Sequence, residues 1–270
     1  MYTVTLNTGR LMPALGLGLY LMQDRQECVD AVRAALDVGY RQFDSAQMYQ
    51  NEAYLGEALR TSRVPRSAQF VTTKIANDNQ LPGRLIASFE RSLQQFGFDY
   101  VDLLLLHFPV TGHRQAAWPL LEQIHASGQA KSIGVSNYTI DHLEELLDTC
   151  HITPAVNQVE LHVYLQQTEL LEYCHNRGIV VQAYSPLAHG HGLDHPVLAK
   201  VAHKHNKTSA QVMIRWCLEA GAVPLPKSSS TERIRQNFDV WDWSLDHDDL
   251  AKLRLLDRGL RTSWDPTEVR

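Results

Sequence analysis

The chain has 270 residues, of which 44% are hydrophobic and 20% are charged, and its formal net charge at pH 7 is −5. This composition is typical of a folded globular protein rather than a disordered, fibrous or disulfide-rich chain. The mild negative charge argues against DNA, RNA or an anionic membrane as the main partner, because all three attract basic surfaces. We expect one domain over residues 1–270.

Targeting and metal-binding signals are weak. No stretch approaches the roughly 18 consecutive apolar residues of a membrane span, and the N-terminus has no basic region followed by an apolar run. We therefore predict a cytoplasmic protein with no membrane partner, and we expect a monomer. The densest histidines, His189, His191 and His195, lie in a glycine-rich stretch with no Cys or Glu at a familiar ligand spacing, which predicts no metal site.

The first predicted element is a hairpin. Residues 2–6 and 10–12 flank Asn7-Thr8-Gly9, a turn signal with glycine at the position that needs positive φ, and we expect a small lid there. Eight short apolar runs typical of strands follow, over residues 15–18, 41–44, 70–74, 101–107, 132–135, 155–160, 180–184 and 223–226. Helical spacing separates them, and further helices are predicted over 196–205 and 246–256.

The order of these elements predicts the fold class. Strand and helix alternate along the whole chain, which indicates βαβ units and a parallel sheet. Eight repeats without a break in composition favour a closed (β/α)8 TIM barrel over an open doubly wound sheet. We therefore predict an α/β protein, a (β/α)8 barrel with an N-terminal β-hairpin and extra helices near the C-terminus.

Three consecutive predicted strands end on reactive side chains. The second strand ends at Asp44, the third at Lys74 and the fourth at His107. A lone Asp could instead cap the next helix, and a lone Lys could reach solvent. All three follow apolar runs, however, and barrels place their active sites at the carboxyl ends of the strands. We expect Asp44 and Lys74 to form an ion pair, because a buried charge is costly unless it is paired.

Seven motifs resemble the aldo-keto reductase family. They are FDSAQMYQNEAYLGEAL from residue 43, TTK ending at residue 74, DLLLLHFP around residue 107, GVSN at 134–137, NQVE at 157–160, AYSPL at 183–187 and PKSSSTERIRQNF at 226–238. The match covers essentially the whole chain. Among the branches of the family, the chain is most similar to the short bacterial 2,5-diketo-D-gluconate and methylglyoxal reductases.

The resemblance implies a chemistry, namely NADPH-dependent reduction of small aldehydes and ketones such as dicarbonyls or keto-sugar acids. In that chemistry Tyr49 donates a proton to the carbonyl oxygen, and Lys74 beside the phenol lowers its pKa. Asp44 holds Lys74 in place. A neutral His107 orients and polarises the carbonyl.

The resemblance also implies a set of cofactor contacts for NADPH/NADP+. Ser136, Asn137 and Gln158 would hold the nicotinamide carboxamide, and Tyr184 would stack on the ring. Ser185 and Leu187 would begin the loop around the pyrophosphate. Lys227, Ser228 and Arg233 would bind the adenosine 2′-phosphate, with Gln236 and Asn237 flanking the adenine. We do not assign Gly16-x-Gly18 to the cofactor, because the third glycine of a dinucleotide motif is missing; we expect close approach at the first strand instead.

The predicted substrate pocket is lined by Tyr20, Met48, Ala76 and Phe108. Family members commonly carry Trp at the positions of Ala76 and Phe108, so this pocket should be wider on one wall. We expect Trp118 to pack under the fourth helix. The chain ends soon after Trp264, which predicts an open site.

Two alternatives use the same barrel. The first is a regulatory subunit that binds NADPH without rapid turnover. The second is an aldolase that forms a Schiff base at Lys74.

Overall fold

Eight short strands form one parallel sheet in the computed structural model, which describes residues 2–269. In chain order the strands are β3 (Leu17–Gly18), β4 (Gln42–Asp44), β5 (Phe70–Ile75), β6 (Leu103–Leu106), β7 (Ile133–Ser136), β8 (Val156–Glu160), β9 (Val180–Tyr184) and β10 (Val223–Leu225). Each strand pairs in parallel with its neighbour in the chain. The predicted (β/α)8 architecture is confirmed.

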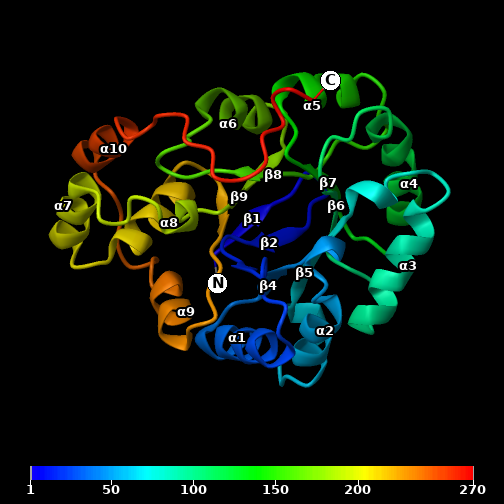
Figure 1. Ribbon diagram of the computed structural model, residues 1–270, viewed down its shortest axis with the longest axis horizontal. Helices are drawn as coiled ribbons and strands as arrows, with labels where there is room; N and C mark the ends of the chain where they lie inside the picture. Colours follow the sequence, from blue (N-terminus) through cyan, green and yellow to red (C-terminus); the bar gives the residue numbers. More distant parts are fainter. Residues whose placement is uncertain (1, 270) are drawn as a thin grey trace.

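Helices ring the strands on the outside (Figure 1). They are α1 (Arg25–Val38), α2 (Glu52–Arg60), α3 (Leu85–Phe96), α4 (Arg114–Ala126), α5 (Ile140–Leu147), α6 (Thr168–His175), α7 (Pro196–His205), α8 (Ser209–Glu219), α9 (Thr231–Phe238) and α10 (His247–Arg254). The extra helices predicted over 196–205 and 246–256 correspond to α7 and α10. No helix among residues 2–269 is long and apolar enough to cross a membrane.

Each predicted strand overlaps an observed one, and the largest difference is at β6. A strand was predicted over residues 101–107, but β6 covers only Leu103–Leu106. Val101 forms an isolated bridge with Ala130 instead. His107 follows the last strand residue, so its side chain stands at the carboxyl edge of the barrel.

The barrel closes where β3 meets β10. Gly16 N donates to Pro224 O and Gly18 N donates to Pro226 O, both at 3.1 Å. A Cβ at Gly18 would lie 2.8 Å from Leu225 O, and one at Gly16 would lie 2.6 Å from Leu225 Cδ2. The expectation that these glycines allow close approach is confirmed.

We expect Gly18→Ala to destabilise the protein by about 1–3 kcal/mol, because the added methyl must displace backbone at the closing seam. Urea denaturation measures this change. Gly83→Ala is the matched control, since a Cβ at Gly83 meets nothing within 4 Å. An equal loss of stability in both variants would contradict the explanation.

The N-terminal hairpin consists of β1 (Thr3–Thr5) and β2 (Leu11–Pro13), paired antiparallel. Leu6 and Met12 pack with Phe70, Leu103 and other residues at the amino ends of the barrel strands. The predicted lid therefore covers the amino end of the barrel, opposite to Asp44, Lys74 and His107, and leaves the carboxyl end open.

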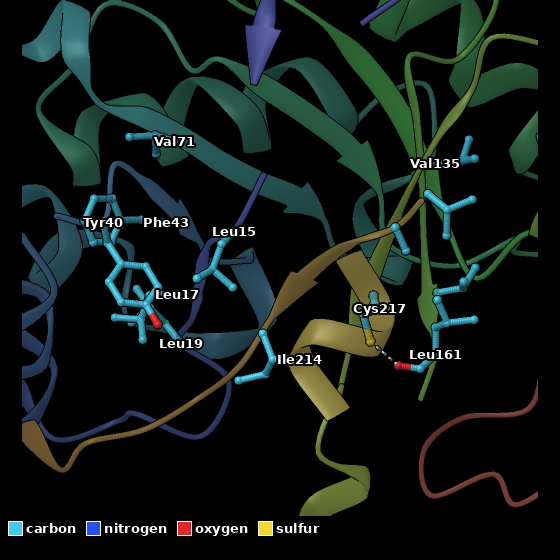
Figure 2. Close-up of a cluster of buried hydrophobic side chains, with 14 of the residues drawn as sticks. Leu15, Leu17, Leu19, Tyr40, Phe43, Val71, Val135, Leu161, Ile214 and Cys217 are labelled. Carbon is cyan, nitrogen blue, oxygen red and sulfur yellow. Dashed lines mark hydrogen bonds between the residues drawn. The ribbon is translucent and has the colours of Figure 1, made fainter. Parts of the chain in front are cut away.

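The larger core lies between the strands and the surrounding helices. Figure 2 shows part of it, with Leu17, Tyr40 and Phe43 on one side and Cys217 of α8 near Leu161 on the other. Trp118 of α4 is buried in this layer, and its Nε1 donates to Ile152 O at 3.2 Å, as expected for a residue that packs under the fourth helix.

The tail after α10 has neither helix nor strand over residues 255–269. It passes α6 and ends beside α5 (Figure 1). His142 Nε2 of α5 lies 2.8 Å from Val269 O, which secures the far end of this tail. The tail therefore returns to the carboxyl end of the barrel, where the candidate site lies.

Candidate active site

A buried ion pair forms the base of the site. Lys74 of β5 contacts the Oδ1 atom of Asp44 in β4, and the Lys74 side chain is 0% exposed. Lys74 Nζ also donates to Ser45 O at 3.0 Å. The predicted pairing is confirmed. Alternation along β4 and β5 places both side chains inside the barrel, where neither would be stable as a lone charge.

Tyr49 lies directly above this pair. Its hydroxyl is 3.3 Å from Lys74 Nζ, and the residue ends a short 3-10 turn, Gln47–Tyr49. Buried Asn51 fixes this loop: its Oδ1 accepts from Ser45 Oγ at 2.6 Å, and its Nδ2 donates to Leu19 O at 2.9 Å. The amide therefore ties the loops after β3 and β4 together and holds the phenol against the lysine.

The pKa of Tyr49 corrects one expectation. We expected Lys74 to lower it, but burial raises the pKa of Tyr49 well above its ordinary value, and the carboxylate of Asp44 raises it further. The physical reason is that burial removes the water that would solvate the phenolate, so the charged form is disfavoured. Tyr49 is therefore firmly protonated in this structure.

His107 stands on the other side of Tyr49, with ring centroids 5.6 Å apart. Burial lowers the pKa of His107 well below its ordinary value, and the charge of Lys74 lowers it further. The imidazole is therefore neutral at pH 7, as expected. Its buried Nδ1 has no hydrogen-bond partner within residues 2–269.

A second polar cluster joins the ends of β7, β8 and β9. Tyr184 OH donates to Asn137 Oδ1 at 2.7 Å, and Asn137 Nδ2 donates to His107 O at 2.9 Å. Ser136 Oγ donates to Gln158 O at 2.8 Å. Gln158 Nε2 also donates to Asp44 Oδ2 at 2.7 Å. The structure thus brings together four residues expected at the nicotinamide and connects them to the ion pair.

The residues expected around the rest of the cofactor lie on two more segments. Ser185 and Leu187 are half-buried in the loop after β9, and Ser185 has a positive φ of 48°. In α9, Gln236 is half-buried and Asn237 is buried, on successive positions. These segments follow β9 and β10, which are neighbours in the sheet.

A basic turn connects β10 to α9. Lys227 and Arg233 are exposed, and Lys227 Nζ lies 3.9 Å from Glu27 Oε1. Ser228 is buried, and its Oγ accepts from Ser230 N at 3.2 Å. The side chain of Ser230 caps the helix by accepting from Arg233 N. Cations, a hydroxyl and a helix N-terminus together can bind a phosphate group.

The mouth of the site is lined by apolar side chains. Tyr20 is 45% exposed and Met48 is 41% exposed, and the Tyr20 ring lies 5.2 Å from that of Tyr49. Ala76 and Phe108 are half-buried on the loops after β5 and β6. The structure therefore places all four residues of the expected pocket on loops after β3, β4, β5 and β6.

Sequence reasoning missed Trp264 as a residue of this mouth. Its ring centroid lies 5.7 Å from that of His107 and 5.9 Å from that of Phe108. The tail was expected to leave the site open, but it places this indole against His107. No local pattern marks this contact, because it depends on where the tail returns.

Acidic and histidine side chains outside the candidate site make contacts that stabilise the fold. Within residues 2–269, Asp246, Asp248 and Asp249 lie close enough to share a metal ion, but Lys204 Nζ lies 2.9 Å from Asp249 Oδ1 and 2.5 Å from Asp246 Oδ2. Of the clustered histidines, His195 caps α7. The expectation of no metal stays a prediction.

Comparison with known proteins gives the family. Residues 14–258 match the model of the aldo/keto reductase family. The oxidoreductase YtbE of Bacillus subtilis is 43% identical, with 97% of this chain and 95% of that protein covered. The glyoxal reductase of Bacillus subtilis is 41% identical, with 99% and 97% covered. The chain belongs to the aldo/keto reductase family and is an oxidoreductase.

A solved structure supports the same assignment. The crystal structure of MGS-M4, an aldo-keto reductase enzyme from a deep-sea metagenome library of the Medee basin, superimposes with a TM-score of 0.95. The two chains are 39% identical, and the match covers 99% of each. Members of this family typically use NAD(P)H.

Proposed function

We propose that this protein reduces small aldehydes and ketones to alcohols with NADPH, and that Tyr49 is the proton donor. The observation that carries the proposal is the arrangement of Tyr49, whose hydroxyl lies 3.3 Å from Lys74 Nζ and whose ring lies beside that of neutral His107. A carbonyl oxygen seated between the phenol and the imidazole would meet two hydrogen-bond donors. NADPH, when bound, supplies the hydride to the carbonyl carbon.

The chain's own residues then perform the proton transfer. Tyr49 holds its proton in the resting site, because burial and Asp44 raise its pKa. As negative charge develops on the substrate oxygen, the phenol becomes the nearest acid and passes its proton to that oxygen. The phenolate that remains lies beside Lys74, whose ammonium stabilises it. Asp44 keeps the ammonium oriented.

The polar residues fit NADPH by the chemistry of their donors and acceptors. Ser136, Asn137 and Gln158 would hold the carboxamide, since hydroxyl and amide groups can both donate to and accept from it. Half-buried Tyr184 offers a ring for stacking, with Ser185 and Leu187 following at the pyrophosphate. Lys227, Ser228 and Arg233 would bind the 2′-phosphate, with Gln236 and Asn237 at the adenine.

The basic turn predicts a preference for NADPH over NADH. We expect Lys227→Ala and Arg233→Ala each to raise the KM for NADPH by about 10- to 100-fold, because each removes a charge-assisted contact with the 2′-phosphate. The KM for NADH, which lacks that phosphate, should stay unchanged. Lys200→Ala, a change at an exposed lysine of α7, is the matched control. Equal increases in the KM for NADPH and for NADH would show that this turn does not bind the 2′-phosphate.

The names of the relatives support a substrate class. Glyoxal reductase of Bacillus subtilis and methylglyoxal reductase DkgA of Escherichia coli, which is 40% identical, carry the names of small dicarbonyls. We infer that dicarbonyls and similar small carbonyl compounds are substrates here. NADPH oxidation measured optically with methylglyoxal, a diketo-sugar acid and 4-nitrobenzaldehyde tests this proposal, and no oxidation with any of them would refute it.

The alternative chemistries have less support. A Schiff base needs an accessible amine, whereas Lys74 is fully buried, paired with Asp44 and covered by the Tyr49 hydroxyl. Borohydride trapping of substrate on the protein would favour the aldolase. A regulatory subunit that only binds NADPH would not require Asp44, Tyr49, Lys74 and His107 to be assembled at one site. The monomeric state and the cytoplasmic location stay predictions from the sequence.

A further inference from the structure

A buried carboxylate at the carboxyl end of the barrel has no part in the proton transfer. Glu160 ends β8, and its side chain is 0% exposed. It accepts hydrogen bonds from Thr262 N at 2.7 Å, from Thr262 Oγ1 at 2.5 Å and from Ser263 N at 3.0 Å. His162 Nε2 lies 3.1 Å from the same carboxylate. Glu160 therefore holds the tail at the two residues that precede Trp264.

These contacts specify the position of the tail closely. Burial acts to raise the pKa of Glu160, but the hydrogen bonds from His162 and Thr262 outweigh it and lower that pKa below its ordinary value. A buried carboxylate is tolerated only when its oxygens are satisfied, so leaving the tail unbound would cost free energy. The bonds that stabilise Glu160 thus also fix the backbone next to Trp264.

Trp264 completes a series of aromatic rings around the reactive groups. Tyr20 and Tyr49 are 5.2 Å apart, Tyr49 and His107 are 5.6 Å apart, and His107 and Trp264 are 5.7 Å apart. The outer members of this series are the exposed ones, since Tyr20 is 45% and Trp264 is 44% exposed. A carbonyl at Tyr49 and His107 would place its substituent next to these two exposed rings.

We propose that Trp264 is a specificity-determining residue that favours carbonyl substrates carrying an aromatic ring, and that Glu160 is the positioning residue that holds Trp264 in place. The proposal rests on the proposed reductase function. An aromatic substituent gains from covering exposed apolar surface and from ring contacts. A substrate carboxylate would gain no comparable contact with Lys74, because the Lys74 ammonium is fully buried and paired with Asp44.

The test compares methylglyoxal with phenylglyoxal, which differ only in the group beside the dicarbonyl. We expect the wild type to prefer phenylglyoxal through a lower KM. Trp264→Ala should lower kcat/KM for phenylglyoxal about tenfold, the loss of one aromatic contact and its buried area, with little change for methylglyoxal. Leu255→Ala removes an apolar side chain that is 84% exposed, and it should change neither substrate.

The role of Glu160 is tested through Trp264. Glu160→Gln should raise the KM for phenylglyoxal without lowering kcat, and it should have no further effect in the Trp264→Ala background. Thr262→Val, which removes a single bond to Glu160, should show the same pattern more weakly and covers the case in which Glu160→Gln fails to fold. An additive loss in the double variant, or an equal loss for both substrates, would overturn the proposal.

A binding measurement separates this proposal from the proposed function. Benzamide and acetamide carry unreactive carbonyl groups, and calorimetric titration reports their affinity without turnover. We expect tighter binding of benzamide that is lost in Trp264→Ala, even if no carbonyl compound oxidised NADPH. Equal affinity of benzamide for the wild type and Trp264→Ala, together with normal reduction of methylglyoxal, would refute the role of Trp264. The proposed reductase function would then still stand.

Discussion

Tyr49→Phe is expected to lower kcat for carbonyl reduction by about 10²- to 10⁴-fold, the usual contribution of a positioned general acid. The phenyl ring preserves the contacts with Tyr20 and His107, and Lys74 keeps its bonds to Asp44 and Ser45. Only the transferable proton is removed. Stopped-flow measurement of NADPH oxidation at saturating methylglyoxal gives the rate.

Two controls make this result specific. NADPH affinity, measured by fluorescence titration, should be unchanged, because the expected cofactor contacts do not include the phenol. Tyr100→Phe removes a hydroxyl just before β6, at the amino end of the barrel and opposite to the site, while its ring can keep the contact with Arg66, and it should keep full activity. Retention of activity in Tyr49→Phe would rule out Tyr49 as the proton donor.

The second large effect concerns stability. Lys74→Met is expected to destabilise the protein by about 3–5 kcal/mol, because it leaves the buried carboxylate of Asp44 without its partner charge. The double variant Asp44→Asn/Lys74→Met should recover most of this loss, since it contains neither charge. Urea denaturation followed by circular dichroism measures both.

Activity measurements distinguish the contribution of the Asp44–Lys74 pair to stability from its contribution to the reaction. Both variants should be inactive, because each lacks the ammonium that stabilises the phenolate of Tyr49. Recovery of stability without recovery of activity would therefore identify the charge itself as a requirement of the reaction. A loss below about 1 kcal/mol in Lys74→Met would mean that water reaches Asp44 and that the pair is less buried than its 0% and 5% exposures indicate.

The contribution of Glu160 to stability depends on pH in a definite direction. In Glu160 the folded-state pKa is lowered, so its contribution to stability is present above the ordinary glutamate pKa and is lost as pH falls through the lowered value. The tail contacts at Thr262 and Ser263 should therefore weaken in acid before the barrel core does.

Much of the fold was determined by the sequence alone. Alternating apolar runs and helical spacing are local patterns, and they predicted eight strands in the observed order together with α7 and α10. The positions of Asp44, Lys74 and His107 at strand ends also followed, because parallel strands in a barrel bring their carboxyl ends to one edge. The pairing of Asp44 with Lys74 could be predicted from the cost of burying either charge.

Tertiary structure decided the contacts that cross the barrel. Gln158 meets Asp44 across 114 residues, and Thr262 meets Glu160 across 102. Periodicity compares only near neighbours along the chain, so it cannot report where a tail without helix or strand will return. This is why Trp264 was not recognised as part of the mouth.

The proton affinity of Tyr49 was likewise set by the folded environment. The resemblance to the aldo-keto reductases implied that the phenol lies near Lys74, but the sign of its pKa shift depends on burial and on the charge of Asp44. Those quantities exist only once the loops after β3 and β4 have closed around the ring. The sequence alone determined that Asp44, Lys74 and His107 share the carboxyl end of the barrel, and the folded structure decided which further groups meet them and how strongly Tyr49 holds its proton.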